Sequence, residues 1–215
     1  SIPGSSFEGN SVFTISSGAT ATSASTARHV VAGNVGDNVT VTIDADSSWF
    51  AGSTLVVARS YDGSTDTVGD GSTGGTASIT VNGTLSVTNL YLGTGGTISG
   101  TGTLSESNLF QDGGTIAAGL SPGVLTIGGD YHFEGGALEI EWAGNESGQF
   151  DQLLVEGSAY LGGVIEFSFE DGFLPNAGDS IVFMEAKGGI SLTDGDVAHA
   201  VIGVDKNFEF SLDFT

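Results

Sequence analysis

A pair of adjacent glycines, followed by a small or branched residue and then a strand-forming residue, recurs along this chain. The intervals between successive pairs are 21, 18, 22, 27 and 26 residues. The copies are Gly74-Gly75-Thr76-Ala77, Gly95-Gly96-Thr97-Ile98, Gly113-Gly114-Thr115-Ile116, Gly135-Gly136-Ala137-Leu138, Gly162-Gly163-Val164-Ile165 and the shorter Gly188-Gly189-Ile190. Intervals near twenty residues are typical of one coil of a solenoid, in which each turn of the chain stacks on the previous one.

The segments between the glycine pairs have the pattern of short β-strands. Thr, Val and Ile alternate with small or polar residues in runs such as 39–43 and 77–81, which gives each run one apolar face. Asn82-Gly83 follows such a run and tolerates the positive φ of a tight turn. No window of helical length carries an apolar stripe. We expect the doubled glycines at corners, where a β-carbon would collide with the neighbouring coil.

Together these features predict an all-β fold, a right-handed parallel β-helix (β-solenoid) with irregular turns, capped or edge-paired at its C-terminal end. Residues 1–73 are expected to form the first coils, residues 74–190 the repeat β-helix, and residues 191–215 capping or edge strands of one continuous domain. Phe208 and Phe210 alternate with polar residues, which suits a strand that covers the unpaired edges of the last coil. Open ends that join subunits end to end are the alternative.

The charge of the chain limits its partners. Twenty-six acidic residues against four dispersed basic ones give a formal net charge of −22. Nucleic-acid binding needs several Lys or Arg side chains on phosphates, so we expect no nucleic-acid partner. The same charge opposes anionic lipid, and no apolar run approaches the ~20 residues that span a membrane. The chain has no cysteine, which excludes disulfides and thiolate metal sites.

Several segments resemble a family of bacterial surface proteins. They are GGTISGTGTLSESNLFQDGGTIAAGLSPG from Gly95 to Gly123, then LTIGGDYHFEGGALEIEWAG, FDQLLVEGSAYLGGVIEFSF and FLPNAGDSIVFMEA. Over roughly residues 74–190, the chain resembles the β-helical stem of autotransporter passenger domains and is similar to autotransporter-associated strand repeats. The resemblance implies a stalk or adhesin at a bacterial surface or in an extracellular matrix.

The candidate catalytic residues are paired carboxylates. Acids two residues apart share a strand face, and a polysaccharide-cleaving β-helix would use two carboxyl groups as acid and base. The candidate pairs are Asp44 with Asp46, Glu139 with Glu141, and Asp194 with Asp196. Alternating acids are also the ordinary solvated face of a strand in an acidic protein, and a pair alone locates no reaction. We therefore assign no catalytic residue and do not expect an enzyme.

Metal and cofactor sites have little support in the sequence. His29, His132 and His199 stand alone, without the spacing of zinc ligands, and are expected at surface or turn positions. The stretch 62–71 concentrates three acids and is the candidate for calcium, although a solvated acidic loop is the favoured interpretation. Residues 120–123 look like a corner rather than a nucleophile elbow. We assign no metal-binding or cofactor-binding residue.

We expect an exported, extracellular structural or adhesive module of a bacterial surface or matrix protein, which self-associates, for example into fibres, or binds other matrix components. The alternative is a carbohydrate-binding or polysaccharide-cleaving β-helix. A glycan site needs a groove lined by exposed aromatic side chains and converging polar groups. Besides phenylalanine, the candidate aromatic residues are Trp49, Trp142, Tyr61, Tyr91, Tyr131 and Tyr160. The last three lie in repeat strands, where core or stacking roles are expected.

Overall fold

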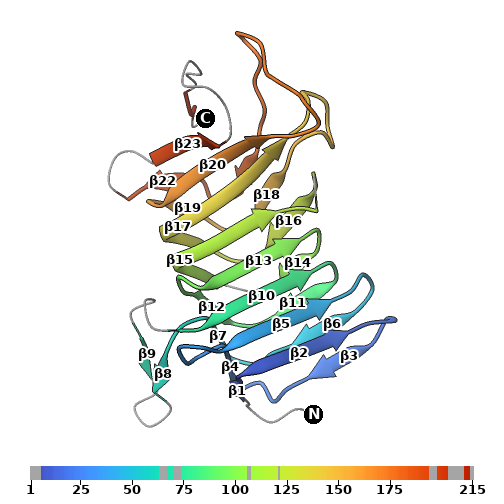
Figure 1. Cartoon of the computed structure of the whole chain (residues 1–215), viewed down its shortest axis with the longest axis vertical. Helices are drawn as coiled ribbons and strands as arrows, with labels where there is room; N and C mark the ends of the chain where they lie inside the picture. Colours follow the sequence, from blue (N-terminus) through green and yellow to red (C-terminus); the bar gives the residue numbers. More distant parts are fainter. Residues whose placement is uncertain are drawn as a thin grey trace.

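The computed structural model of the chain consists of short β-strands that lie across the long axis of the molecule (Figure 1). It describes residues 6–62, 67–69, 74–105, 108–120, 122–193, 198–202 and 211–213. The strands are β1 (Ser6–Phe7), β2 (Asn10–Ile15), β3 (Thr20–Thr22), β4 (Arg28–Val31), β5 (Asn38–Ile43), β6 (Ser48–Phe50), β7 (Thr54–Val57), β8 (Tyr61–Asp62), β9 (Thr67–Val68), β10 (Thr76–Val81), β11 (Thr84–Ser86), β12 (Asn89–Leu92), β13 (Gly96–Gly100), β14 (Thr103–Ser105), β15 (Asn108–Ala118), β16 (Val124–Ile127), β17 (Tyr131–Trp142), β18 (Gln152–Val155), β19 (Ala159–Leu161), β20 (Val164–Phe169), β21 (Met184–Ala186), β22 (Ile190–Leu192) and β23 (Ala198–Ile202).

The strands stack in three columns along the molecule. The first column is β1-β4-β7-β12-β15-β17-β19-β22, and the second is β2-β5-β10-β13-β15-β17-β20-β23. The third column is β3-β6-β11-β14-β16-β18-β21. Neighbouring strands within each column are parallel, whereas β8 and β9 form an antiparallel hairpin. The chain visits the three columns in turn, and each such circuit is one pass of the chain. Strands β15 and β17 are long enough to contribute to both the first and the second column.

The predicted right-handed parallel β-helix with irregular turns, capped or edge-paired at the C-terminal end, is wrong as a description of the sheets. The all-β content and the parallel pairing agree with the expectation. The first two columns, however, are one 14-stranded sheet, and nine of its strands turn through 304° around an axis, so that it is nearly closed like a barrel. The reason lies in β15 and β17, whose backbones pair through the bend with register shifts at Asp112 instead of breaking there.

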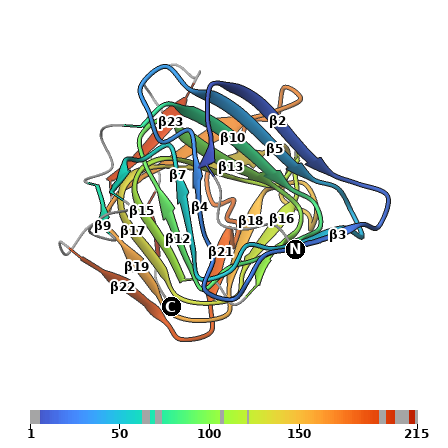
Figure 2. The ribbon, with the colours of Figure 1, turned by 90° about the horizontal axis from the view of Figure 1, so that it is seen from below.

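The three columns surround one interior (Figure 2). Val39 and Val41 of β5 are fully buried, whereas Thr40 between them is partly exposed. The strand register places Ile79 of β10 beside Val41, and Ile98 of β13 beside Ile79. Alternation with a period of two, combined with parallel register, therefore stacks like apolar side chains along the core.

The doubled glycines lie where successive passes of the chain come closest. A β-carbon added to Gly95 would overlap the carbonyl oxygen of Gly75, and one added to Gly136 would overlap that of Gly114. Gly136 also has a φ of +86°, which side chains rarely adopt. The expected collision with the neighbouring pass is thus confirmed at these positions, and it explains why glycine pairs recur at intervals of about one pass from residue 74 onward.

Each end of the stack has three strands that pair on one side only within the described residues. They are β1, β2 and β3 at the lower end and β22 and β23 at the upper end (Figure 1), together with β21, the last strand of the third column. Both β22 and β23 continue the parallel columns, through β19 and β20. The expected capping residues Phe208 and Phe210 lie outside the described residues.

Candidate functional site

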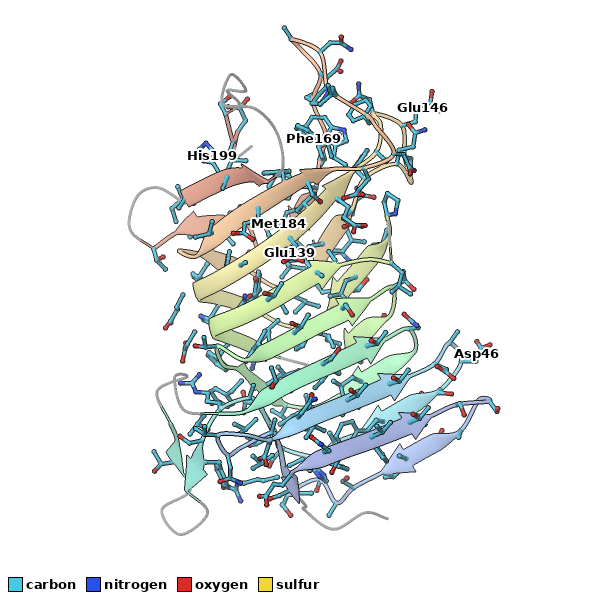
Figure 3. The ribbon with its side chains drawn as sticks, in the orientation of Figure 1. Asp46, Glu139, Glu146, Phe169, Met184 and His199 are labelled. Atoms are coloured by element: carbon cyan, nitrogen blue, oxygen red, sulfur yellow. The ribbon has the colours of Figure 1, made fainter. Side chains whose placement is uncertain are left out.

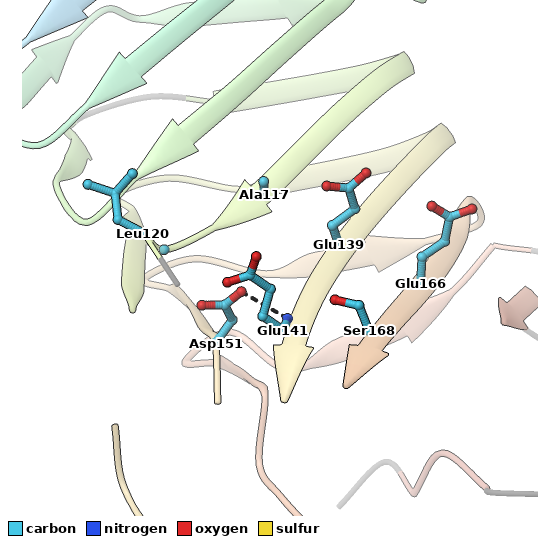
Figure 4. Close-up of a pocket in the computed structure, with 8 residues that line it drawn as sticks. Ala117, Leu120, Glu139, Glu141, Asp151, Glu166 and Ser168 are labelled. Carbon is cyan, nitrogen blue, oxygen red and sulfur yellow. Dashed lines mark hydrogen bonds between the residues drawn. The ribbon is translucent and has the colours of Figure 1, made fainter. Parts of the chain in front are cut away.

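A pocket of about 310 Å³ on the flank of the second column gathers four carboxyl groups (Figure 4). Glu139 and Glu141 occupy alternate outward positions of β17, and the register places Glu166 and Ser168 of β20 beside them. The fourth carboxyl group is that of Asp151, just before β18. The expectation that Glu139 and Glu141 share a strand face is confirmed, since both line this pocket.

The electrostatics of the pocket favour proton uptake. Burial raises the pKa of Glu139, and the negative charges of Glu166 and Glu141 raise it further. Sequence spacing predicted the neighbour on the same strand but not Glu166, which lies 27 residues away and meets Glu139 through the register of β17 and β20. Like charges side by side on parallel strands are destabilising unless a proton, a cation or solvent compensates them.

Asp151 is the most buried of the four acids. Its side chain accepts hydrogen bonds from the backbone N–H groups of Gly123 at 2.7 Å and Glu141 at 2.9 Å. Burial raises the pKa of Asp151 to about 6, because the loss of solvation outweighs these two hydrogen bonds. The carboxyl group joins Gly123, just before β16, to the end of β17. It therefore holds two passes of the chain together.

Other aspartates tie the backbone in the same way. Asp37 accepts hydrogen bonds from Gly9 at 2.7 Å and Asn34 at 2.9 Å, and these bonds lower its pKa. Asp130 accepts a hydrogen bond from the N–H of Ser158 at 2.8 Å. Each bond between distant residues links successive passes at a corner where strand pairing stops. Part of the acid content of the chain thus has a structural role.

The raised pKa of Asp151 predicts that stability depends on pH. The native state keeps this proton up to about pH 6, while the unfolded chain releases it near the ordinary aspartate pKa of 3.8. The native state therefore binds more protons between these two pH values. Stability should then fall as pH rises. We expect the contribution of Asp151 to the free energy of unfolding to be about 1 kcal/mol larger at pH 5 than at pH 7.5. Urea unfolding at constant ionic strength measures it.

The matched comparison for this pH effect uses two charge-neutralising variants. Asp151→Asn should flatten the dependence of unfolding free energy on pH, whereas Glu146→Gln, at an exposed position, should leave it as in the parent. Equal pH dependence in the parent and in Asp151→Asn would show that the Asp151 proton is not linked to folding.

Of the other candidate pairs, the described one, Asp44 with Asp46, is not brought to this pocket. Asp44 and Asp46 lie in the turn after β5 rather than on one strand face, so that expectation is wrong; Asp46 adopts a φ of +63°. Figure 3 shows Asp46 in the lower half of the molecule and Glu139 in its upper half. Asp194 and Asp196 lie outside the described residues.

The histidines also take positions that spacing did not reveal. His29 is fully buried in β4, which corrects the expected surface or turn position. Its Nε2 lies 2.8 Å from the hydroxyl oxygen of Ser23, and its ring contacts that of Trp49 with centroids 5.3 Å apart. His132 is half-buried in β17, and His199 lies in β23. Among the described residues, no group of three or more His, Asp or Glu side chains is arranged to hold a metal ion.

The candidate calcium stretch and the 120–123 corner are only partly described. Residues 63–66, 70–73 and 121 lie outside the described residues, as does the side chain of Asp62. The visible part of the stretch forms the β8-β9 hairpin. In the described ranges there is no helix of the length and apolarity that a membrane crossing requires.

An aromatic ladder runs up the outer face of the first column. Tyr91, Phe110, His132 and Tyr160 stack on successive strands, with ring centroids 4.9, 4.8 and 4.8 Å apart and nearly parallel rings. Tyr131 is instead fully buried in the core. The expected core and stacking roles of these tyrosines are confirmed. The ladder was not recognisable in the sequence because its rungs lie on four different passes.

A buried arginine covers the lower end of the ladder. The guanidinium of Arg59 lies over the ring of Tyr91, 5.8 Å from its centroid, and forms an ion pair with Asp112. Its Nε donates a hydrogen bond to the carbonyl of Gly69, at the end of the β8-β9 hairpin. One of the four basic residues therefore anchors a hairpin to the stack and is not available to bind a ligand.

The fold and these features define an all-β protein of stacked parallel strands with a carboxylate-lined pocket on its flank. No protein-family model matches the chain, and no curated protein matches it. The geometry of the chain itself is then the basis on which its function is inferred.

Proposed function

We propose that this chain is an extracellular structural or adhesive module of a bacterial surface or matrix protein, in which the strand stack acts as a spacer and as a subunit of larger assemblies. The observation that carries the proposal is the continuity of three parallel columns that end in unpaired strand edges at both ends of the described stack. The resemblance of residues 74–190 to autotransporter passenger stems supports it.

The columns suit a spacer because every pass is held by its neighbours. Backbone hydrogen bonds, stacked apolar side chains and aspartate bridges such as Asp130 to Ser158 all act between successive passes. A stack of this kind resists bending and lengthens by adding passes, without a change in cross-section. These properties suit a stalk better than a catalytic scaffold.

The edge strands at the two ends of the stack are arranged so that a second copy of the chain can attach end to end. Within the described strands, each column has one edge without a neighbouring strand at the lower end and one at the upper end, and its strands all run in the same direction. A head-to-tail copy could therefore continue all three columns with parallel pairing. Such a contact joins different surfaces of the two molecules and does not close, so repetition of it produces a filament.

The charge of the chain sets the conditions for assembly. A formal charge of −22 opposes the approach of two copies. Divalent cations such as calcium would reduce this repulsion through diffuse binding, without a dedicated site. We therefore propose self-association or other matrix components as partners, with assembly that is stronger in calcium than in chelator.

Electron microscopy of the purified chain tests this proposal directly. At matched concentrations, we expect rods joined end to end in calcium and shorter particles in chelator. A variant that blocks one edge is Val12→Pro. Val12 of β2 is 77% exposed. The carbonyl groups of Gly9 and Ile15 point toward β5. Backbone groups of successive residues in a strand point alternately to its two edges, so the N–H of Val12 points away from β5, toward the open edge. Proline removes that N–H.

The control variant is Val12→Thr, which keeps the N–H group and the strand propensity. It should assemble like the parent, whereas Val12→Pro should give short particles with an unchanged melting temperature. Dispersed single particles of the parent in both calcium and chelator, at the highest soluble concentration, would refute assembly through the strand edges.

The acidic pocket does not lead us to propose polysaccharide cleavage. Both carboxyl oxygens of Asp151 already accept backbone hydrogen bonds, from Gly123 and Glu141, which gives this acid a structural role. The described lining of this pocket also includes no aromatic ring against which a sugar could stack.

A further inference from the structure

A second pocket, of about 310 Å³, lies on the outer side of the third column near the lower end of the stack. Phe50 of β6 lies between its register partners Thr22 of β3 and Ser86 of β11. Its neighbour Trp49 is fully buried, and strand alternation therefore turns Phe50 outward, where it is 45% exposed. The sheet thus presents an aromatic ring flanked by two hydroxyl-bearing residues.

The described lining of this pocket is neutral, although the chain is strongly acidic. Besides Phe50, the described lining residues are Ser, Thr, Gly and Val, and none of them carries a charge. Thr88, at the end of the corner after β11, adds a further hydroxyl group. Hydroxyl groups both donate and accept hydrogen bonds. The pocket therefore matches a neutral ligand that carries several hydroxyl groups and one flat apolar face.

The wall of this pocket is fixed from inside the protein. Ser23 lines the pocket, is 7% exposed, and has its hydroxyl oxygen 2.8 Å from Nε2 of the buried His29. Gly52, with a φ of +84°, lies so close to the carbonyl oxygens of Ala24 and Ala27 that a β-carbon would overlap both. The corners that carry the pocket are thus held by packing and hydrogen bonds before any ligand arrives, which lowers the cost of binding.

We propose that this pocket binds one ring of a neutral carbohydrate. The C–H face of a hexose would pack on the Phe50 ring, while its hydroxyl groups exchange hydrogen bonds with the Thr22, Ser86 and Thr88 side chains. A uronate or a sulfated sugar would be repelled by the net charge of the chain. This site goes beyond the spacer role and does not depend on it, because binding at the flank of the third column needs no assembly.

An array of immobilised oligosaccharides tests the proposal, with neutral glucans, galactans and mannans beside uronate-containing and sulfated glycans. We expect the wild-type chain to bind at least one neutral class and none of the anionic ones. Isothermal titration with the strongest neutral oligosaccharide on the array should show an affinity loss of about tenfold or more in Phe50→Ala, since the aromatic platform is removed.

The matched control is Leu174→Ala, which truncates another exposed apolar side chain, 60% exposed and outside this pocket. It should bind as the wild type does, and Thr88→Val should bind more weakly with an unchanged melting temperature. The proposal is overturned if the wild type binds no neutral glycan at millimolar concentration, if it prefers anionic glycans, or if Phe50→Ala retains full affinity. Electron microscopy of the same samples reports assembly separately.

Discussion

Replacement of Gly136 by alanine is expected to destabilise the protein by about 3 kcal/mol or more. Two effects add at this position. The φ of +86° is unfavourable for alanine, and the new β-carbon would overlap backbone atoms of Gly113 and Gly114 in the preceding pass. Backbone of a packed neighbour moves only at high cost, so the two passes must separate or β17 must bend. Equilibrium unfolding in urea measures the loss.

Gly148→Ala separates the two effects. Gly148 has almost the same φ, +83°, but an added β-carbon would have no atom within 4 Å. This variant should therefore lose only about 1 kcal/mol, the cost of the backbone conformation. Similar losses in Gly136→Ala and Gly148→Ala would mean that contact between passes is not the reason for the glycine at position 136.

Gln111→Leu is expected to cost about 3 kcal/mol, because it breaks a buried polar network where β15 bends between the first two columns. Gln111 is fully buried, and its Nε2 donates hydrogen bonds to the carbonyls of Gly114 at 3.2 Å and Ala137 at 2.9 Å. Its Oε1 accepts a hydrogen bond from the hydroxyl of Tyr131 at 2.6 Å. Burial raises the pKa of Tyr131, which keeps that hydroxyl protonated as a donor.

A double-mutant cycle with Tyr131→Phe identifies the network as the cause. Tyr131→Phe alone should cost about 1 to 2 kcal/mol, since it leaves the Gln111 oxygen without its donor. The double variant should be more stable than the sum of the two single losses predicts, because neither orphaned partner of that bond remains. Strict additivity in urea unfolding would contradict a direct coupling between the two side chains.

The repeat explains why much of the fold could be predicted from the sequence and why the sheet organisation could not. Alternation in residues 39–43 and 77–81 correctly placed the valines and isoleucines inside. The glycine pairs correctly marked close approaches between passes. They were also expected to interrupt the strands, but β15 and β17 continue through Gly113-Gly114 and Gly135-Gly136, with shifts in the pairing register at the bend. Whether a glycine pair breaks a strand or bends it depends on the pass beside it, which local sequence does not specify.

The pocket and the ladder show the same limit at the level of side chains. The pair Glu139 and Glu141 was recognisable from a spacing of two residues, but Glu166 and Asp151 reach the pocket through strand register and a corner. His29 was expected at a surface or turn position because no ligand spacing accompanied it. Its burial depends on Ser23 and Trp49, which belong to neighbouring corners and strands. Contacts between passes separated by variable intervals have no fixed signature in the sequence.

Disulfide cross-linking tests most directly the claim that successive passes stack in parallel register. The chain has no cysteine, so any disulfide that forms within it must join the two introduced cysteines. Thr80 and Ser99 are register partners in the second column, and Thr84 and Thr103 are partners in the third. Parallel neighbours lie about 4.8 Å apart, within disulfide range, whereas the diagonal pair Thr80 and Thr97 is about 8 Å apart.

Mild oxidation of purified double-cysteine variants, followed by mass spectrometry, gives the cross-linked fraction. The stacked register predicts rapid and nearly complete cross-links in Thr80→Cys with Ser99→Cys and in Thr84→Cys with Thr103→Cys, and slow, incomplete cross-links in Thr80→Cys with Thr97→Cys. Faster cross-linking of the diagonal pair than of the register partners would contradict the stack on which the spacer role, the glycine contacts and both pockets depend.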